Sequence, residues 1–119
     1  MEKFLLLIRE DLVARENMTK EEFDRNIQLM TKWIESMAES GNFINADALH
    51  KAGRYVGRSY VLSDGPFIEA KEAISGFVLI NAENTEQAAS IAQSCPLVLN
   101  DTAVIEVRPV MIIENESSN

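Results

Sequence analysis

Three segments of this 119-residue chain are apolar on both faces, so each predicts a β-strand that must be covered from two sides. They are the segments Phe4–Ile8, Phe77–Ile80 and Val104–Val107. Successive side chains of a strand point to opposite faces, so a single covering layer leaves half of these apolar residues in water. The fold must therefore place apolar material against both faces of the sheet that these strands form.

Two helices are predicted between the strands, each with its own capping signal. The longer helix begins at the capping box Thr19-Lys20-Glu21-Glu22 and ends at Gly41, in the left-handed conformation. Its apolar stripe is Phe23, Ile27, Met30, Ile34 and Met37, with Trp33 beside it. The second helix has Asn84 as its N-cap, buries Ala88, Ile91, Ala92 and Cys95, and ends at Pro96.

Further strands are predicted at Asn42–Leu49, at Arg54–Leu62 with a bend or bulge at Gly57, and at Gly76–Ala82. Residues 12–18 form a connection without an assigned structure. The order strand, helix, two or more strands, helix, strand predicts an α+β protein of ferredoxin-like topology. In this sandwich an antiparallel sheet carries two helices on one face.

The two helices cover only one face of the predicted sheet, so the other face exposes Leu, Val, Ile and Phe side chains. Monomers rarely expose an apolar patch larger than a few hundred Å². A second copy of the chain, packed sheet to sheet about a two-fold axis, removes this exposure. We therefore expect a homodimer, with small-molecule clefts at the ends of the paired sheets.

Composition limits the classes of partner. The net charge of −8 argues against nucleic acid and against an anionic membrane, because both require a basic surface. The apolar run near the N-terminus is too short for a signal peptide or a membrane span. A single cysteine, Cys95, forms no disulfide within the chain, as expected for the cytoplasm. Residues 1–113 are expected to form one domain and residues 114–119 a polar, disordered tail.

The stretch from Asp64 to Glu72 has the most unusual local chemistry. Asp64-Gly65-Pro66 is a turn signal that leads from a strand into an exposed loop. The apolar Phe67 and the charged Glu69, Lys71 and Glu72 follow. In one interpretation the stretch is a loop that connects two strands, with its charged side chains in solvent and Phe67 packed beneath it. In the other it shapes a pocket in which Asp64 or Glu69 is a working carboxylate.

This stretch resembles the signature of the DGPF family, also called YCII-related proteins. Further matches are Gly76-Phe77, the Ala-rich helix that ends at Cys95-Pro96, the segment Glu106-Val107-Arg108-Pro109, the Phe4–Ile8 strand and the segment Ala46-Asp47-Ala48-Leu49. The resemblance extends to about Ile113 and implies a dimeric α+β barrel. It implies no single activity. Some relatives have a His–Asp pair whose histidine lies in the first helix, but this chain has no histidine there.

Acid–base chemistry is the catalytic class that the residues favour. His50 is the only histidine, and it could pair with Asp64 or Glu69 as an acid–base couple, although it could also be an ordinary loop residue. We expect no metal, because no residues have zinc-ligand spacing or form an EF-hand loop, and no other cofactor. Cys95 is expected to be a core residue whose thiol pKa is raised by the C-terminal end of its helix.

Anion binding is the second class. His50, Lys51, Arg54 and Arg58 form a local positive cluster in an acidic chain. Arg54 and Arg58 are predicted to share one strand face and could bind a carboxylate or a phosphate, or could simply be solvated. Phe67 and Lys71 are further candidates for contact with a substrate. Arg108 is a candidate partner for Asp64 or Glu69.

Two functional hypotheses result. In the first, the protein is a cofactor-independent lyase or isomerase that acts on a small organic molecule, with Asp64 or Glu69 as the base and Arg54 or Arg58 holding the charge of the substrate. In the second, it is a non-catalytic ligand sensor or accessory module, since the family resembles proteins found beside sigma-factor systems. An enzyme of this kind requires a carboxylate with a perturbed pKa inside the cleft, whereas a sensor requires only shape.

Overall fold

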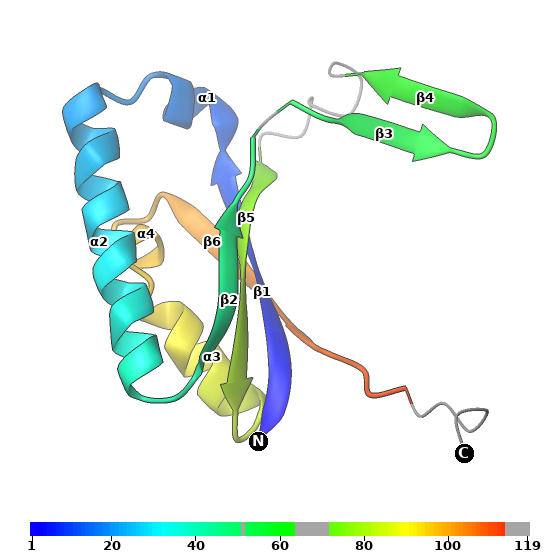
Figure 1. Cartoon of the computed structure of the whole chain (residues 1–119). Coiled ribbons are helices and arrows are strands. Elements are labelled where there is room, and N and C mark those ends of the chain that lie inside the picture. The colour runs from blue at the N-terminus through cyan, green and yellow to red at the C-terminus, as the bar shows by residue number, and fades with distance from the viewer. Residues whose placement is uncertain (51, 64–71, 114–119) are drawn as a thin grey trace.

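The computed structural model describes residues 1–50, 52–63 and 72–113, which form a sandwich of one sheet and one helical layer with a projecting hairpin (Figure 1). The elements are β1 (Glu2–Asp11), α1 (Leu12–Glu16), α2 (Lys20–Glu39), β2 (Phe43–Ala48), β3 (Arg54–Gly57), β4 (Tyr60–Ser63), β5 (Glu72–Ala82), α3 (Thr85–Gln93), α4 (Pro96–Leu99) and β6 (Ala103–Pro109). The predicted residues Asp64, Phe67, Glu69 and Lys71, and the predicted tail 114–119, lie outside the described residues.

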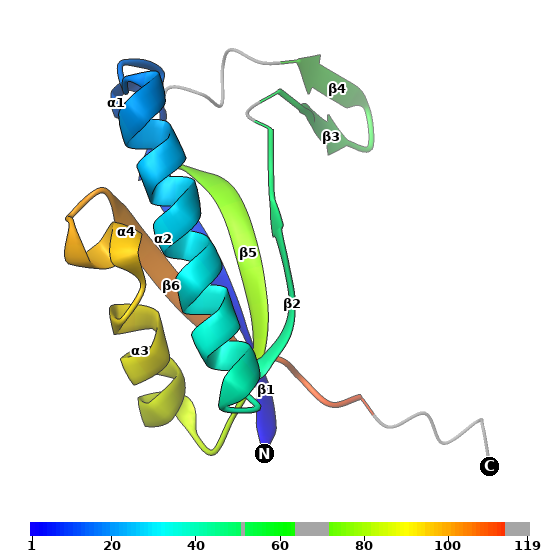
Figure 2. The same cartoon turned by 60° about the vertical axis from the view of Figure 1, so that its left-hand side comes forward.

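Four of the strands form one antiparallel sheet in the order β2-β5-β1-β6. The chain visits them in the order β1, β2, β5, β6, with a helical crossover before β2 and another before β6. This is the ferredoxin-like α+β topology, and it confirms the predicted fold class. The helices α2, α3 and α4 lie on one face of the sheet, as Figures 1 and 2 show.

The core lies between this helical layer and the sheet. Alternate residues of β1 and β5 point into it, namely Phe4, Leu6, Ile8, Val78, Ile80 and Ala82. From the helices, Trp33 and Met37 of α2 and Ala88 and Ala92 of α3 are buried. Trp33 is thus a core residue rather than a neighbour of the predicted stripe, and its indole N–H donates to Ser94 Oγ at 2.9 Å.

The predicted N-caps Thr19 and Asn84 and the left-handed Gly41 are confirmed. Thr19 Oγ1 accepts from Glu22 N at 3.1 Å, and α2 runs for 20 residues before Gly41, whose φ is 81°. Asn84 Oδ1 accepts from Gln87 N at 2.8 Å at the start of α3. Local hydrogen bonds at these positions replace the partners that the first N–H groups of a helix lack, which fixes where both crossovers begin.

Four parts of the predicted secondary structure were wrong or incomplete. The single strand predicted for Arg54–Leu62 is a hairpin, β3 and β4, joined at Arg58 and Ser59. The connection 12–18 contains α1, which Asp11 caps by accepting from Val13 N and Ala14 N. The second predicted helix, α3, ends at Gln93 rather than at Pro96. Pro96 instead begins the additional helix α4, because proline suits the first helical position. The last strand, predicted at Val104–Val107, is longer and runs from Ala103 to Pro109 as β6.

The other face of the sheet is not covered by any helix of the described chain (Figure 1). We call this the open face. Register places Leu5 and Leu7 of β1 beside Leu79 and Phe77 of β5 there. These side chains are only partly buried. The sequence prediction that one face lacks a helical cover is therefore confirmed.

One charged cluster lies on the open face beside the apolar residues. Glu106 accepts from Arg9 at 2.9 Å and from Arg108 at 3.1 Å. The hydrogen bond from Arg9, with a smaller contribution from Arg108, lowers the pKa of the Glu106 carboxyl. Arg108 therefore has Glu106 as its partner in the described structure. Its predicted partners Asp64 and Glu69 lie outside the described residues.

Candidate functional site

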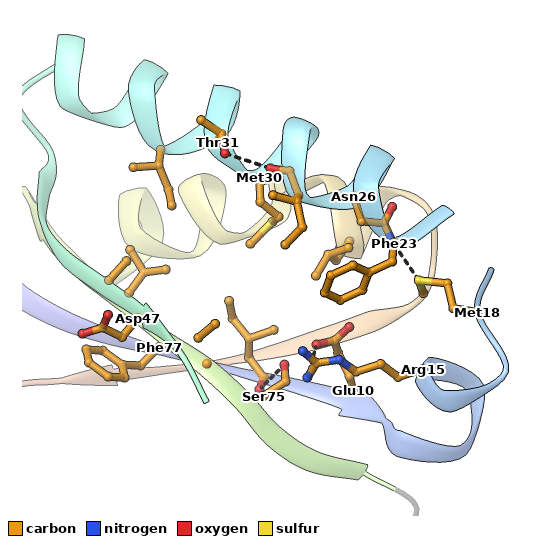
Figure 3. A pocket seen from close by; sticks show the side chains of 18 residues that line it. Glu10, Arg15, Met18, Phe23, Asn26, Met30, Thr31, Asp47, Ser75 and Phe77 are labelled. Carbon is orange, nitrogen blue, oxygen red and sulfur yellow. Dashed lines mark hydrogen bonds and ion pairs between the residues drawn. The ribbon is translucent and has the colours of Figure 1, made fainter. Parts of the chain in front are cut away.

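A cavity of about 310 Å³ lies between α2 and the sheet, near the end of β1 (Figure 3). Most of its wall is apolar. From the helical layer it is lined by Met18, Phe23, Asn26, Ile27, Met30, Thr31, Ile34 and Leu97. From β1, α1 and the other strands it is lined by Ile8, Glu10, Arg15, Ala46, Asp47, Ala48, Ser75, Gly76, Phe77 and Val78. Pockets of this size and lining bind small organic molecules.

The apolar stripe of α2 explains why the cavity exists. Its C-terminal half packs on the sheet, where Met37 is buried, whereas its N-terminal half overhangs the cavity. Ile27 lines the cavity and is 51% exposed. The predicted stripe is therefore correct as a pattern, but only part of it is core. The remainder forms one wall of a pocket.

Two opposite charges form the polar end of the cavity. Glu10 follows Phe4, Leu6 and Ile8 on the core-facing side of β1, and its side chain is only 12% exposed. Arg15, from α1, lies 3.8 Å from Glu10, measured from Nη1 to Oε2. The Arg15 guanidinium also lies 6.0 Å from the centre of the Phe23 ring, within the range of a cation–π contact. Figure 3 shows the pair facing the interior below Phe23.

A β-bulge adds a hydroxyl to the wall. The pairing of β1 with β5 passes from Ile8–Gly76 to Arg9–Ile74, so Ser75 is an extra residue in β5. Ser75 is buried, lines the cavity and donates a long hydrogen bond, 3.5 Å, to the carbonyl of Ile8. Bulges often turn a side chain toward a functional site. At the next position, a Cβ on Gly76 would lie 2.9 Å from the carbonyl oxygen of Asp47, so β2 approaches closely only because Gly76 has no side chain.

A second cavity of about 270 Å³ adjoins the first, and Arg15 and Phe23 line both. Its other lining residues are Leu12, Glu16, Leu49 and His50. His50 thus lies at a cavity, although Asp64 and Glu69, its predicted acid–base partners, lie outside the described residues. A catalytic role for His50 stays a prediction.

The predicted anion-binding arginines are not on one strand face. Arg54 begins β3 and donates to the carbonyl of Gly53 at 2.9 Å, and Arg58 lies in the hairpin turn. Both are exposed, and neither lines the cavity under α2.

The residues of this cavity that sequence reasoning missed are Glu10, Arg15 and Ser75. An acidic residue on the core-facing side of an otherwise apolar strand was the one available signal.

Cys95 is buried between α3 and α4, where its thiol lies 3.6 Å from the Met30 sulfur. Burial raises the pKa of the Cys95 thiol, and backbone hydrogen bonds from Leu97 and Val98 oppose this only in part. The predicted direction is correct, but the principal cause is burial rather than the end of a helix.

Among residues 1–50, 52–63 and 72–113, no three His, Cys, Asp or Glu side chains are grouped to hold a metal ion.

No helix of the described chain is both long and apolar enough to cross a membrane. A comparison with curated proteins finds none that matches this sequence. The family model of the YCII-related domain, in contrast, matches residues 3–114, which include every described helix and strand except the first residue of β1. The chain therefore belongs to the YCII-related domain family.

Proposed function

We propose that this YCII-related protein binds a small, mostly apolar organic molecule in the cavity under α2, with one polar or anionic group of that molecule at the Glu10–Arg15 end. The observation that carries this proposal is an apolar cavity whose charged wall residues include a cation and a carboxylate side by side. Apolar walls supply affinity, and a few polar groups fix the orientation of the ligand.

The size of the cavity limits the ligand. A volume of about 310 Å³ equals that of about ten liquid water molecules, which corresponds to a ligand of about ten to fifteen non-hydrogen atoms. Met18 and Met30 lie on the wall and adapt to different shapes, because methionine side chains are flexible. A single substituted ring or a short branched acid has the right size.

Arg15 is the group that would select an anion. Its 3.8 Å separation from Glu10 is longer than the 2.7–2.9 Å of a strong charge-assisted hydrogen bond, so the guanidinium retains donors for a ligand carboxylate. Arginine binds carboxylates in a two-pronged geometry that lysine does not reproduce. In this proposal Arg15, rather than Arg54 or Arg58, would hold the small organic anion that the sequence suggested.

Cofactor-independent acid–base catalysis in the same cavity is a second candidate. The Glu10 carboxylate lies on the wall with little exposure to solvent, where a bound molecule would contact it. Glu10 would then remove a proton from the ligand, as in a lyase or an isomerase, while Arg15 would hold the negative charge that develops. If no turnover occurs, the same site serves a ligand sensor or an accessory module.

We also infer that the protein forms a homodimer through the open face. Leu5, Leu7, Phe77 and Leu79 form an apolar surface there, and packing against a second copy would remove it from water. The Arg9–Glu106–Arg108 cluster would lie at the edge of this interface, because β6 is an edge strand.

A thermal-shift screen of small organic acids, lactones and phosphates tests the binding proposal. A ligand at a hundred times its dissociation constant stabilises the folded state by about 2.7 kcal/mol, which is easily detected. Ala48→Leu should abolish binding, because Ala48 lines the cavity and a larger side chain fills it. Arg15→Gln should weaken the binding of anionic ligands about tenfold or more.

Arg58→Gln is the matched control, because Arg58 is exposed in the hairpin turn and does not line this cavity. A ligand that responds to Arg58→Gln but not to Arg15→Gln would move the site to the hairpin and refute the proposal. For each ligand found, turnover is then measured in the wild type and in Glu10→Gln. Loss of turnover with retained binding supports catalysis by Glu10, whereas binding without turnover supports a sensor.

A further inference from the structure

The hairpin formed by β3 and β4 has few contacts with the rest of the described chain. Its two strands pair in register from Arg54–Ser63 to Gly57–Tyr60, and β3 and β4 form a sheet separate from the main one. No described helix or strand packs extensively against it. An isolated two-stranded hairpin is at best marginally stable in water. A hairpin that projects in this way therefore needs a surface to pack on.

Each face of the hairpin carries exposed apolar side chains, and Arg54 shares the valine face at the start of β3. Residues directly opposite each other in an antiparallel pair share a face, so Val56 and Val61 lie together on one side. They are 70% and 63% exposed. On the other side, the ring of Tyr60 lies directly over Gly57, and this tyrosine is also exposed. Two valines side by side with this exposure are unfavourable in water, which indicates an element that packs against another chain segment.

The hairpin projects on the side of the open face. In Figure 1 the helices lie to the left of the sheet and the hairpin extends to the right, beyond one end of the strands; in Figure 2 it lies behind the sheet and α2 lies in front. A chain that packs on the open face would therefore meet the hairpin.

Charge favours a second copy of this chain as that partner. The charged residues of the hairpin are Arg54 and Arg58, both positive, in a chain whose net charge is −8. On another copy, each edge of the open face offers a carboxylate, Asp47 on β2 and Glu106 on β6, the latter already paired with Arg9 and Arg108. Under two-fold symmetry the arm of each subunit packs on the other subunit, so both contacts are satisfied in a dimer and no further subunit is added.

We propose that the β3–β4 hairpin is an intersubunit arm: in the homodimer, the valine side of each hairpin packs against the rim of the open face of the other subunit. This inference rests on the dimer proposed above, and it adds a second contact to the sheet-to-sheet interface. It assigns a role to Val56 and Val61 that the cavity under α2 does not explain.

The first test uses an isosteric double variant, Val56→Thr with Val61→Thr. Threonine has the shape and strand propensity of valine but places a hydroxyl where a methyl group was, so the hairpin keeps its conformation and loses apolar contact. Sedimentation velocity over a range of concentrations should show the dissociation constant of the dimer raised about tenfold or more. The matched control is Val13→Thr in α1, because Val13 is also 63% exposed but lies outside the hairpin.

The second test locates the contact. Ser59 lies in the hairpin turn and Cys95 is buried, so Ser59→Cys supplies an accessible thiol for a benzophenone label. Light-induced cross-links should join two different chains. A mixture of unlabelled and isotope-labelled protein distinguishes such cross-links from those within one chain. Mass spectrometry should place them on the edge strands β2 or β6 of the second chain.

The outcomes separate the arm from the dimer. If the wild type is monomeric at about 100 μM, the proposed dimer fails and the arm fails with it. If the wild type is dimeric, but the double valine variant dissociates no more readily than Val13→Thr, the arm proposal alone is overturned. It is also overturned if the cross-links lie within one chain or on the helical layer of the other chain. The ligand-binding proposal is unaffected by either result, because the cavity belongs to a single subunit.

Discussion

Two adjacent leucines of β1 test the proposed dimer, because they lie on opposite faces of the sheet. Leu6 points into the core and is fully buried, beside Val78 and Val107 in the register of the sheet. Leu7 points to the open face, beside Phe77 and Glu106, and is only partly buried. The change Leu→Ala at the two positions removes the same atoms from two different environments.

The two substitutions should differ in how much they lower the free energy of unfolding and in how that loss depends on protein concentration. Leu6→Ala creates a cavity in the core and should lower the free energy of unfolding by about 3–5 kcal/mol at any concentration. That is a large part of the 5–15 kcal/mol typical of a folded domain. In an isolated subunit Leu7→Ala should cost only about 1 kcal/mol. In a dimer the same change acts twice at one interface and should weaken association.

Urea unfolding at two protein concentrations, about 1 and 100 μM, measures both effects. A hundredfold increase in concentration stabilises a dimer that dissociates on unfolding by about 1.4 kcal/mol per subunit, by mass action. We expect this shift in the wild type and expect it to be lost or reduced in Leu7→Ala. A wild type whose unfolding is independent of concentration would refute the dimer. A cost for Leu7→Ala as large as that for Leu6→Ala, at both concentrations, would show that the open face is covered by the same chain.

Three further predictions concern the fold. Ser94→Ala removes the acceptor of the Trp33 indole N–H and should lower the free energy of unfolding in urea by about 1–3 kcal/mol, and an unchanged value would contradict this role. The lowered pKa of Glu106 contributes stability that is present above about pH 4.3, the unfolded value, and is lost as the pH falls through the folded pKa. Glu106→Gln should therefore flatten the stability–pH profile in this acidic range, and an unaltered slope there would count against the Arg9 contact. The buried thiol of Cys95, with its raised pKa, should react with a disulfide reagent at pH 8 about a hundredfold more slowly in the native protein than in urea; equal rates would show that it is accessible.

The fold was predictable because its signals are local and periodic. Thr19, Gly41 and Asn84 mark helix ends through their own hydrogen bonds or their own φ, so each signal acts within a few residues. The hairpin was missed because its turn, Arg58-Ser59, lacks the Asn-Gly or Asp-Gly pair that favours a two-residue turn. Without that signal, a continuous strand and a hairpin give the same apolar pattern.

The cavity was not predictable, because its polar end is assembled from three separate segments. Glu10 lies one residue before the end of β1, Arg15 lies in a five-residue helix, and Ser75 faces the cavity through a bulge that shifts the register by one residue. The apolar stripe of α2 indicates which side of the helix is apolar. It does not indicate that Ile27 lines an open cavity while Met37 is packed in the core. That difference depends on how far the sheet extends under the helix.

The position of Glu10 is itself an argument for function. Burial of a carboxylate is unfavourable unless it is fully paired, and the 3.8 Å contact with Arg15 is a weak pairing. An apolar side chain at this position would suit the apolar wall of the same cavity, which includes Ile8, Met30 and Val78, better. Glu10→Leu should therefore leave the free energy of unfolding unchanged or raise it by about 1 kcal/mol, while it abolishes turnover or the binding of polar ligands. Urea unfolding and the ligand screen measure the two effects on one variant. A loss of stability greater than about 1 kcal/mol would show instead that the Glu10–Arg15 pair supports the fold, and the carboxylate would then need no ligand to explain its place.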